Sequence, residues 1–131
     1  MKERERGRLR NDHMKAYWEK EMEAIREVVL SGENILSSHI INQMNKRNIS
    51  VQEVAATLLN GKIVEGYDIG DYSGYRNPNI FRTVVCELRE NYYVIVGLAL
   101  SYSGSTIKIE NFNTVYSRNN FTKKIQCLIS Y

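Results

Sequence analysis

The chain has 131 residues, of which 43% are hydrophobic and 25% charged, and it contains a single proline. This composition predicts one globular domain with a buried core and excludes extensive disorder. The longest apolar stretch, Tyr92 to Leu100, is much shorter than the ~20 residues that cross a bilayer. We therefore expect no membrane insertion, and the charged start MKERERGRLR does not resemble a signal peptide.

The net charge of +3 lies at the N-terminus. Residues 1–10 hold five basic and two acidic side chains, whereas the rest of the chain has equal numbers of each. A basic arm can bind phosphate, but it is also typical of a solvated helix start or of a linker cut from a longer protein. The charge alone does not identify a function.

No metal or other cofactor is expected. The two histidines, His13 and His39, are far apart, and the two cysteines, Cys86 and Cys127, lack the paired spacing of a zinc site. The sequence also has no phosphate-binding glycine loop and no nucleophile elbow.

The first helix is predicted from about Asn11 to Leu30. Asn11 or Asp12 can cap its start, and Gly32 can take a left-handed conformation after its end. Apolar residues follow steps of three and four along one face: Met14, Tyr17, Trp18, Met22, Ile25 and Val29.

Two shorter helices should follow. One begins near Ser37 or Ser38 and ends at about Arg47, with Ile40, Ile41 and Met44 as its apolar flank. The next begins at Ser50, where Ser50 and Glu53 can form a capping box, and ends at Asn60-Gly61.

After Gly61 the apolar pattern changes to a period of two, which predicts strands. They are expected at 62–69, 81–88, 92–100 and 106–116, with a last one at 125–129. Three helices followed by a meander of four to five antiparallel strands is an α+β fold. We divide the chain into a basic arm and N-terminal helix (1–34) and a compact domain (35–131).

Polar residues of the second helix could form a site. His39, Gln43 and Arg47 are spaced by four, so they share one stripe of the helix. An imidazole can transfer protons near neutral pH, and a guanidinium can bind phosphate at two points. The same pattern also fits a solvated helix face whose histidine borders the core.

Two further groups have both a functional and a structural interpretation. Thr114 and Tyr116 should project from the same face of a strand and could hold a phosphate, or they are ordinary strand formers. Tyr67, Tyr72 and Tyr75, with Arg76, could stack on unpaired bases or line a core rim.

Several separated pieces of the chain, in order, resemble the domain of unknown function 4258 family. They are the run from His39 through Arg47 to Ser50, then Glu53-Val54, Leu58 and Gly61 to Glu65, then Tyr92 to Val96 and Thr114-Val115-Tyr116. The resemblance covers roughly residues 35–117. It implies the barnase, EndoU, colicin and RelE-like (BECR) fold, with N-terminal helices packed on a twisted antiparallel sheet.

The same resemblance implies a function. Members of that fold group are commonly metal-independent ribonucleases that act as toxins, many at the C-termini of secreted bacterial proteins. Carried over, His39 is the catalytic histidine, Arg47 a phosphate-side group, and Thr114 and Tyr116 the strand pair. Gln43, Lys46, Lys62, Arg76 and Tyr93 are expected to bind substrate.

Two positions depart from the family pattern. Gln43 stands where the family usually has arginine, and Tyr93 stands where it often has a second histidine. Either other residues supply the missing cation and base, or the activity has changed or been lost.

We therefore expect an endoribonuclease that acts through the RNA 2′-hydroxyl, with tRNA among its candidate substrates and an acidic immunity protein as partner. It would be delivered into a target bacterium as part of a larger protein. The alternative is a non-catalytic module of the same fold that binds RNA or protein.

Overall fold

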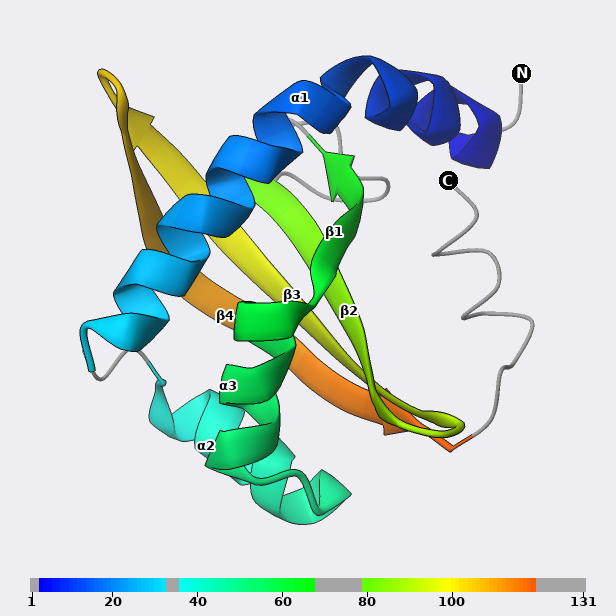
Figure 1. The fold of residues 1–131 in the computed structure, drawn as a ribbon, viewed down its shortest axis with the longest axis vertical. Coiled ribbons are helices and arrows are strands. Elements are labelled where there is room, and N and C mark those ends of the chain that lie inside the picture. Colours follow the sequence, from blue (N-terminus) through cyan, green and yellow to red (C-terminus); the bar gives the residue numbers. More distant parts are fainter. Residues whose placement is uncertain (1–2, 33–35, 68–78, 120–131) are drawn as a thin grey trace.

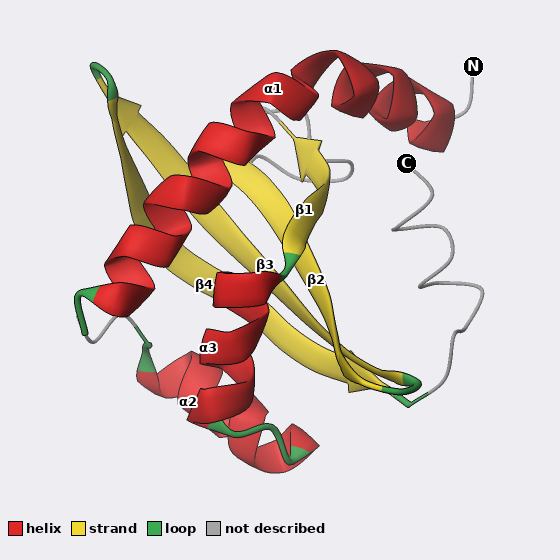
Figure 2. Ribbon diagram, in the orientation of Figure 1, coloured by secondary structure: helices red, strands yellow, loops and turns green. Residues whose placement is uncertain are grey.

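The computed structural model describes residues 3–32, 36–67 and 79–119. Three helices precede four strands, and the strands form one antiparallel sheet in the order β1-β2-β3-β4 (Figures 1 and 2). The helices lie on one side of this open, twisted sheet (Figure 1). The predicted α+β class is therefore confirmed. The candidate strand at 125–129 and Arg76 lie outside the described residues.

Helix α1 spans Glu3–Leu30 and crosses the sheet. It begins eight residues before the predicted start, so Asn11 and Asp12 lie within the helix and do not cap it. The physical reason is that the segment before Asn11 is rich in glutamate and arginine, which have good helix propensity. At the other end, Gly32 has a φ of 76°, as the prediction required.

The buried face of α1 is made by Trp18, Met22 and Ile25. Tyr17, which we expected on this face, is 57% exposed. Arg26 extends from α1 to the end of α3, where its guanidinium donates to the carbonyl oxygens of Leu59 and Gly61 at 3.0 and 3.3 Å. This contact satisfies carbonyl groups that a helix C-terminus leaves without partners.

Helix α2 spans Ser38–Arg47, with Ser37 as the N-cap and Asn48 as a left-handed C-cap. Ile40 and Met44 are buried, but Ile41 is 39% exposed, so the predicted three-residue flank was wrong at that position. In a helix, positions 40 and 44 share a face, whereas position 41 is turned by ~100° from it. Two buried anchors thus orient α2 on the core.

Helix α3 spans Val51–Asn60 and begins with the predicted capping box. The Glu53 amide donates to the Ser50 hydroxyl at 3.1 Å, and the Ser50 amide donates to the Glu53 carboxylate at 2.9 Å. Both donors would otherwise have no partner within the helix.

The strands are β1 (Lys62–Tyr67), β2 (Ile80–Arg89), β3 (Tyr92–Ser103) and β4 (Thr106–Arg118). Two-residue turns join β2 to β3 and β3 to β4, and left-handed Asn91 and Gly104 lie in these turns. β3 is one of the two inner strands, and its residues 93–100 are buried, as the apolar run predicted. β1 and β4 are the two edges.

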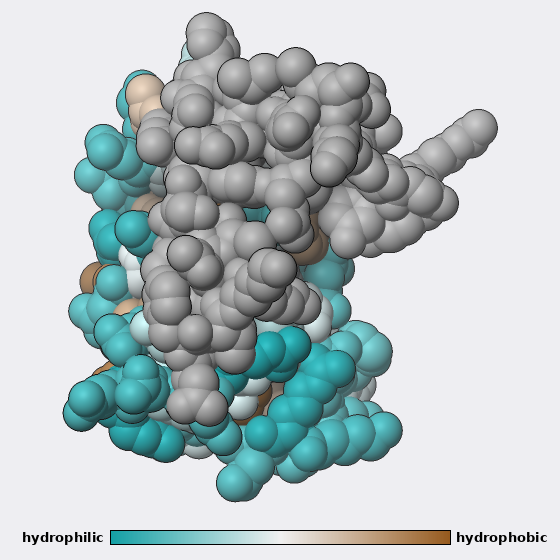
Figure 3. Space-filling view, turned by 90° about the vertical axis from the view of Figure 1, so that its right-hand side faces the viewer, coloured by the Kyte–Doolittle hydropathy of each residue, from teal (hydrophilic) through white to brown (hydrophobic). Residues whose placement is uncertain are grey.

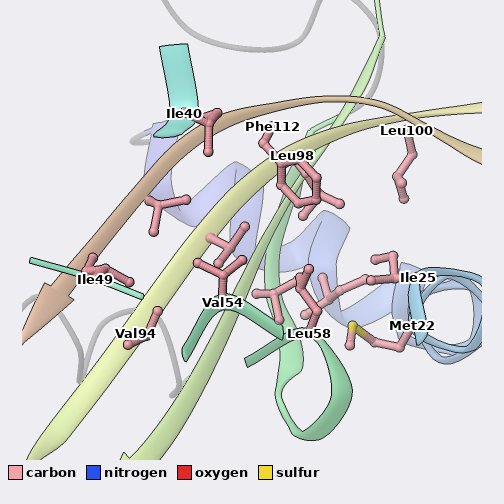
Figure 4. Packing of buried hydrophobic residues seen from close by; sticks show 14 of the residues in the cluster. Met22, Ile25, Ile40, Ile49, Val54, Leu58, Val94, Leu98, Leu100 and Phe112 are labelled. Carbon is pink, nitrogen blue, oxygen red and sulfur yellow. The ribbon is translucent and has the colours of Figure 1, made fainter. Parts of the chain in front are cut away.

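The main core lies between the helices and the sheet (Figure 4). Met22, Ile25, Ile40, Val54 and Leu58 come from the three helices and meet alternate residues of β3, together with Phe112 and Val115 of β4. The opposite face carries a second cluster of Val64, Val85, Tyr93 and Ile95, against which Tyr116 packs. Neighbouring residues of β4 therefore face different clusters.

A buried ion pair joins α1 to β2. The Arg82 guanidinium donates to both carboxylate oxygens of Glu21, at 2.6 and 3.1 Å, and both side chains are at most 1% exposed. The Tyr102 hydroxyl also donates to Glu21. A Cβ on Gly66 would lie 2.7 Å from the Arg82 guanidinium, so glycine leaves the space that this side chain occupies.

Candidate functional site

The polar stripe of α2 lies along the edge strand β4. Because Ile40 and Met44 are buried in the core, Gln43 and Arg47 are turned toward β4, against which α2 packs. The predicted stripe is therefore not simply a solvated face, although His39 and Arg47 are both exposed and only Gln43 is partly buried.

Gln43 and Arg47 bind the outward-facing backbone groups of Val115. The Val115 amide donates to Gln43 Oε1 at 3.2 Å, and Arg47 Nη1 donates to the Val115 carbonyl oxygen at 2.7 Å. These are the groups that a further strand would pair with, since an edge strand presents unpaired N–H and C=O groups. Two side chains thus take the place of a strand at this point.

The Val115 amide also determines which nitrogen of His39 carries the ring proton. Because Val115 N–H is a donor only, Gln43 must present its oxygen to β4 and its NH₂ group to the helix surface. Gln43 Nε2 lies 3.0 Å from His39 Nε2. An amide NH₂ cannot accept, so His39 Nε2 is the acceptor and the ring proton is assigned to Nδ1.

Thr114 joins this group through its hydroxyl. Arg47 Nη1 donates to Thr114 Oγ1 at 3.4 Å, and Thr114 Oγ1 lies 3.5 Å from Gln43 Oε1. Arg47 Nη1 also donates to Gln43 Oε1 at 3.2 Å. We name the chain of contacts through His39, Gln43, Arg47 and Thr114 the polar chain.

A hollow of about 540 Å³ lies beside the end of the polar chain. Its wall contains Arg47, Thr114, Tyr116, Ser117 and Arg118, and we name it the Arg118 hollow. The Arg118 guanidinium lies 4.8 Å from the centre of the Tyr116 ring. Two guanidinium groups, two hydroxyls and a phenol suit an anion such as phosphate.

A second hollow, of about 860 Å³, shares Arg47 and Ser117 with the first. Glu53, Arg89 and Tyr92 also line it, and we name it the Arg89 hollow. It lies where α2, α3 and the β2–β3 turn meet, at the lower end of Figure 1. On the face shown in Figure 3, the described residues at this end are mainly hydrophilic.

Glu53 is held as a carboxylate in this wall. Burial raises its pKa, but hydrogen bonds from Ser50 and Tyr92 and the charge of Arg89 outweigh that effect, so the pKa is below its usual value. Tyr92 is affected in the opposite direction, because burial and the nearby Glu53 raise the pKa of its phenol. The Tyr92 hydroxyl donates to Glu53 and accepts from Ser117.

Other predicted site residues do not meet at this point. Lys46 is exposed in the last turn of α2 and lines neither hollow. Lys62 starts β1, three strand spacings or about 14 Å from β4. Tyr93 is 7% exposed and packs in the second cluster, as Tyr116 does, and it is paired with Arg118 in the strand register, but it lines neither hollow. His39 reaches Thr114 only through Gln43, and it lines neither hollow.

Among the residues that the structure describes, no three His, Cys, Asp or Glu side chains gather as a metal ion would require. In the same part of the chain, no helix is long and apolar enough to cross a membrane.

A family model described as a domain of unknown function (DUF4258) matches residues 36–116, more than half of the chain. The chain belongs to the DUF4258 family. Comparison with curated proteins finds no match, and comparison with solved structures finds none either.

The DUF4258 segment runs from the residues before α2 to Tyr116 in β4, so it includes the whole polar chain. Helix α1 precedes it, yet Trp18, Met22 and Ile25 of α1 complete the same core. Of the two departures from the DUF4258 pattern, Gln43 lies at the centre of the polar chain and Tyr93 lies apart from it.

Four residues of the hollows were not identified as functional from the DUF4258 sequence: Glu53, Arg89, Tyr92 and Arg118. From the sequence, Glu53 is expected in the capping box of a helix, and Arg89 lies between two predicted strands. Arginines two or three residues away from strand tyrosines, as in Arg89-Glu-Asn-Tyr92 and Tyr116-Ser-Arg118, are the available signal.

Proposed function

We propose that this domain cleaves RNA without a metal ion, with the scissile phosphate bound between the polar chain and the Arg118 hollow. The observation that carries the proposal is the polar chain itself. It joins an exposed imidazole on α2 to an arginine and a hydroxyl at a hollow that contains a second arginine.

The residues supply the groups that this reaction needs. The 2′-oxygen of RNA attacks the adjacent phosphorus, and the bond from phosphorus to the 5′-oxygen breaks. His39 Nε2 takes the 2′-hydroxyl proton after exchanging its hydrogen bond from Gln43 for the substrate, and the Tyr116 phenol gives a proton to the leaving 5′-oxygen. The Arg47 and Arg118 guanidinium groups stabilise the charge on the phosphoryl oxygens.

The products are a 2′,3′-cyclic phosphate and a 5′-hydroxyl end. DNA lacks the attacking hydroxyl and is spared. Purified protein should therefore cleave total RNA and tRNA in the presence of a chelator and leave single-stranded DNA intact. Folded protein that leaves RNA intact across buffers from pH 5 to 8 would contradict the proposal.

The resemblance to ribonuclease toxins extends the proposal to a biological role. We propose a toxin domain that an exported bacterial protein delivers into the cytoplasm of a target cell, with an acidic immunity protein that covers the arginine-lined hollows in the producer. Expression in a bacterium should arrest growth, and co-expression of the immunity protein should restore it. Normal growth during expression of folded protein would contradict the role.

A non-catalytic module that binds RNA or protein is the second candidate. Gln43 and Arg47 already bind the Val115 backbone, and the lone pair on His39 Nε2 already accepts from Gln43. These contacts favour a structural role for the same residues. Binding of RNA without cleavage, together with harmless expression, would support this candidate over the first.

A further inference from the structure

We propose that Arg89, stacked on Tyr92, is a platform for an unpaired base, so that the substrate is single-stranded RNA. This inference rests on the proposed function because it names the substrate class of the same site. It concerns the Arg89 hollow, whereas the cleavage proposal concerns the polar chain and the Arg118 hollow.

The platform is built before any ligand binds. The Arg89 guanidinium carbon lies 3.9 Å from the centre of the Tyr92 ring. Arg89 ends β2 and Tyr92 begins β3, and the two residues are partners in the sheet register. The short turn between them therefore places the two side chains next to each other across the strands.

Tyr92 is fixed on its other sides. Its hydroxyl donates to Glu53 and accepts from Ser117, and its ring packs against the main core. A ring held by two hydrogen bonds and a core contact is a rigid support for the guanidinium above it.

The ion pair with Glu53 contributes little to the reason for an arginine at position 89. Its nearest carboxylate oxygen, on Glu53, is 3.9 Å away, and the Arg89 side chain is 68% exposed. Ion pairs this long and this exposed contribute little to stability. The guanidinium therefore presents much of its surface to solvent, where a further planar group can stack.

The hollow favours a ligand with both a planar ring and negative charge. Arginine planes and aromatic side chains are the surfaces on which unpaired bases stack. Arg47 lines both the Arg89 hollow, which holds this platform, and the Arg118 hollow. A base on Arg89 is therefore adjacent to a phosphate near Arg47, as in consecutive parts of one nucleic-acid strand.

Pairing state then determines binding. Bases in a duplex are already stacked on both faces and cannot reach a platform at a hollow without unpairing. Single strands offer a free base face, so they should bind more tightly than duplexes of the same length.

The test is the affinity of the full chain for labelled 2′-O-methyl RNA, which lacks the attacking hydroxyl and stays intact. Fluorescence anisotropy should show at least tenfold tighter binding of the single strand than of the duplex. Arg89→Ala should weaken single-strand binding by roughly 5- to 20-fold, the scale of a lost stacking contact. Arg89→Lys should weaken single-strand binding almost as much, because lysine retains the positive charge but lacks the planar guanidinium group.

Lys108→Ala is the matched control, because Lys108 is an exposed cation near the opposite end of β4. It should change affinity less than twofold. Wild-type affinity in Arg89→Lys, equal affinity for duplex and single strand, or equally tight binding of a polyglutamate peptide would overturn the platform.

The two proposals can fail separately. Stacking that depends on Arg89 in a protein that never cleaves unmodified RNA refutes only cleavage. Cleavage that proceeds with unchanged single-strand affinity in Arg89→Ala refutes only the platform.

Discussion

Gln43 accepts hydrogen bonds at the α2–β4 contact, which an arginine at this position could not do. Its side-chain oxygen accepts from the Val115 amide at 3.2 Å and from Arg47 at 3.2 Å. A guanidinium has only donors, so arginine at this position would leave the Val115 amide without that acceptor. Glutamine at this position therefore determines how the helix contacts the edge strand.

Gln43→Ala should lower the free energy of unfolding by about 1–2 kcal/mol, because it leaves a half-buried backbone donor without its acceptor. Gln43→Glu keeps the acceptor and should lose less. Urea denaturation measures both. Equal stability of Gln43→Ala and the wild type would show that water accepts from the Val115 amide as well as the Gln43 side chain does.

His39→Ala should lower the rate of RNA cleavage by roughly 100-fold or more, the usual scale of a lost general base. Its stability should be nearly unchanged, because His39 is exposed and, among the described residues, it hydrogen-bonds only to Gln43 on the same helix. Single-turnover cleavage measures the expected loss of activity, and thermal melting measures the stability. A lower melting temperature with full activity per folded molecule would make His39 a structural residue.

At the scale of elements, polar contacts fasten α1 to the rest of the fold. Arg26 binds the last carbonyl groups of α3, and Glu21 binds Arg82 of β2 and Tyr102 of β3. The buried pair specifies one position of the helix along the sheet, since sliding α1 by a turn would leave two buried charges unpaired. This is the register role that buried ion pairs can have.

Arg82→Leu should destabilise the protein by about 3–5 kcal/mol, because it leaves the Glu21 carboxylate buried without its cation. The double variant Glu21→Leu/Arg82→Leu should recover much of that loss, since no buried charge remains. Denaturant unfolding of the wild type, both single variants and the double variant gives the coupling energy. A double variant as unstable as the sum of the two single ones would argue against coupling.

The capping box of α3 should make stability depend on pH. The pKa of Glu53 is below its usual value of 4.5 in the folded protein, so the unfolded chain binds its proton more readily. The stabilisation is therefore complete above the unfolded pKa and is lost as the pH falls through the folded pKa.

Unfolding measured between pH 3 and 7 should show Glu53→Gln less stable than the wild type at pH 7 and similar to it at pH 3. Glu90→Gln, in the exposed β2–β3 turn, is the control for removal of a carboxylate and should follow the wild-type curve. A constant difference between Glu53→Gln and the wild type across this range would contradict the assignment.

Across the whole molecule, local signals predicted the elements well. The capping box at Ser50 and Glu53 and the apolar run of β3 are patterns of neighbouring residues, and both were confirmed. The start of α1 was misplaced because Asn11 and Asp12 are good caps that the preceding helix-forming residues override.

The site was predicted only in part, because its contacts cross the fold. Spacing brought His39, Gln43 and Arg47 onto one stripe, but the acceptor on Val115 is 68 residues from Arg47. The Glu21–Arg82 pair joins residues 61 apart, and periodicity contains no information about such partners. Lys62 was assigned to the site without knowledge of strand order, which places it at the other edge.

A chain that begins at residue 35 should not form the native core. It lacks Trp18, Met22 and Ile25 and leaves the buried Arg82 without Glu21. Near-ultraviolet circular dichroism and denaturant unfolding of this fragment should show no cooperative transition, whereas the full chain should show one. A cooperative fragment would mean that α1 is an addition to an independent domain.

Trp18 makes this dependence visible by optical means. It is the only tryptophan of the chain, it is 4% exposed, and its indole N–H has no hydrogen-bond partner among the described residues. Its fluorescence therefore reports an apolar environment that exists only while α1 is seated on the sheet. Trp18 lines neither hollow, so binding of a nucleotide in the hollows should not shift its emission spectrum. A red shift would instead show that α1 has separated from the sheet.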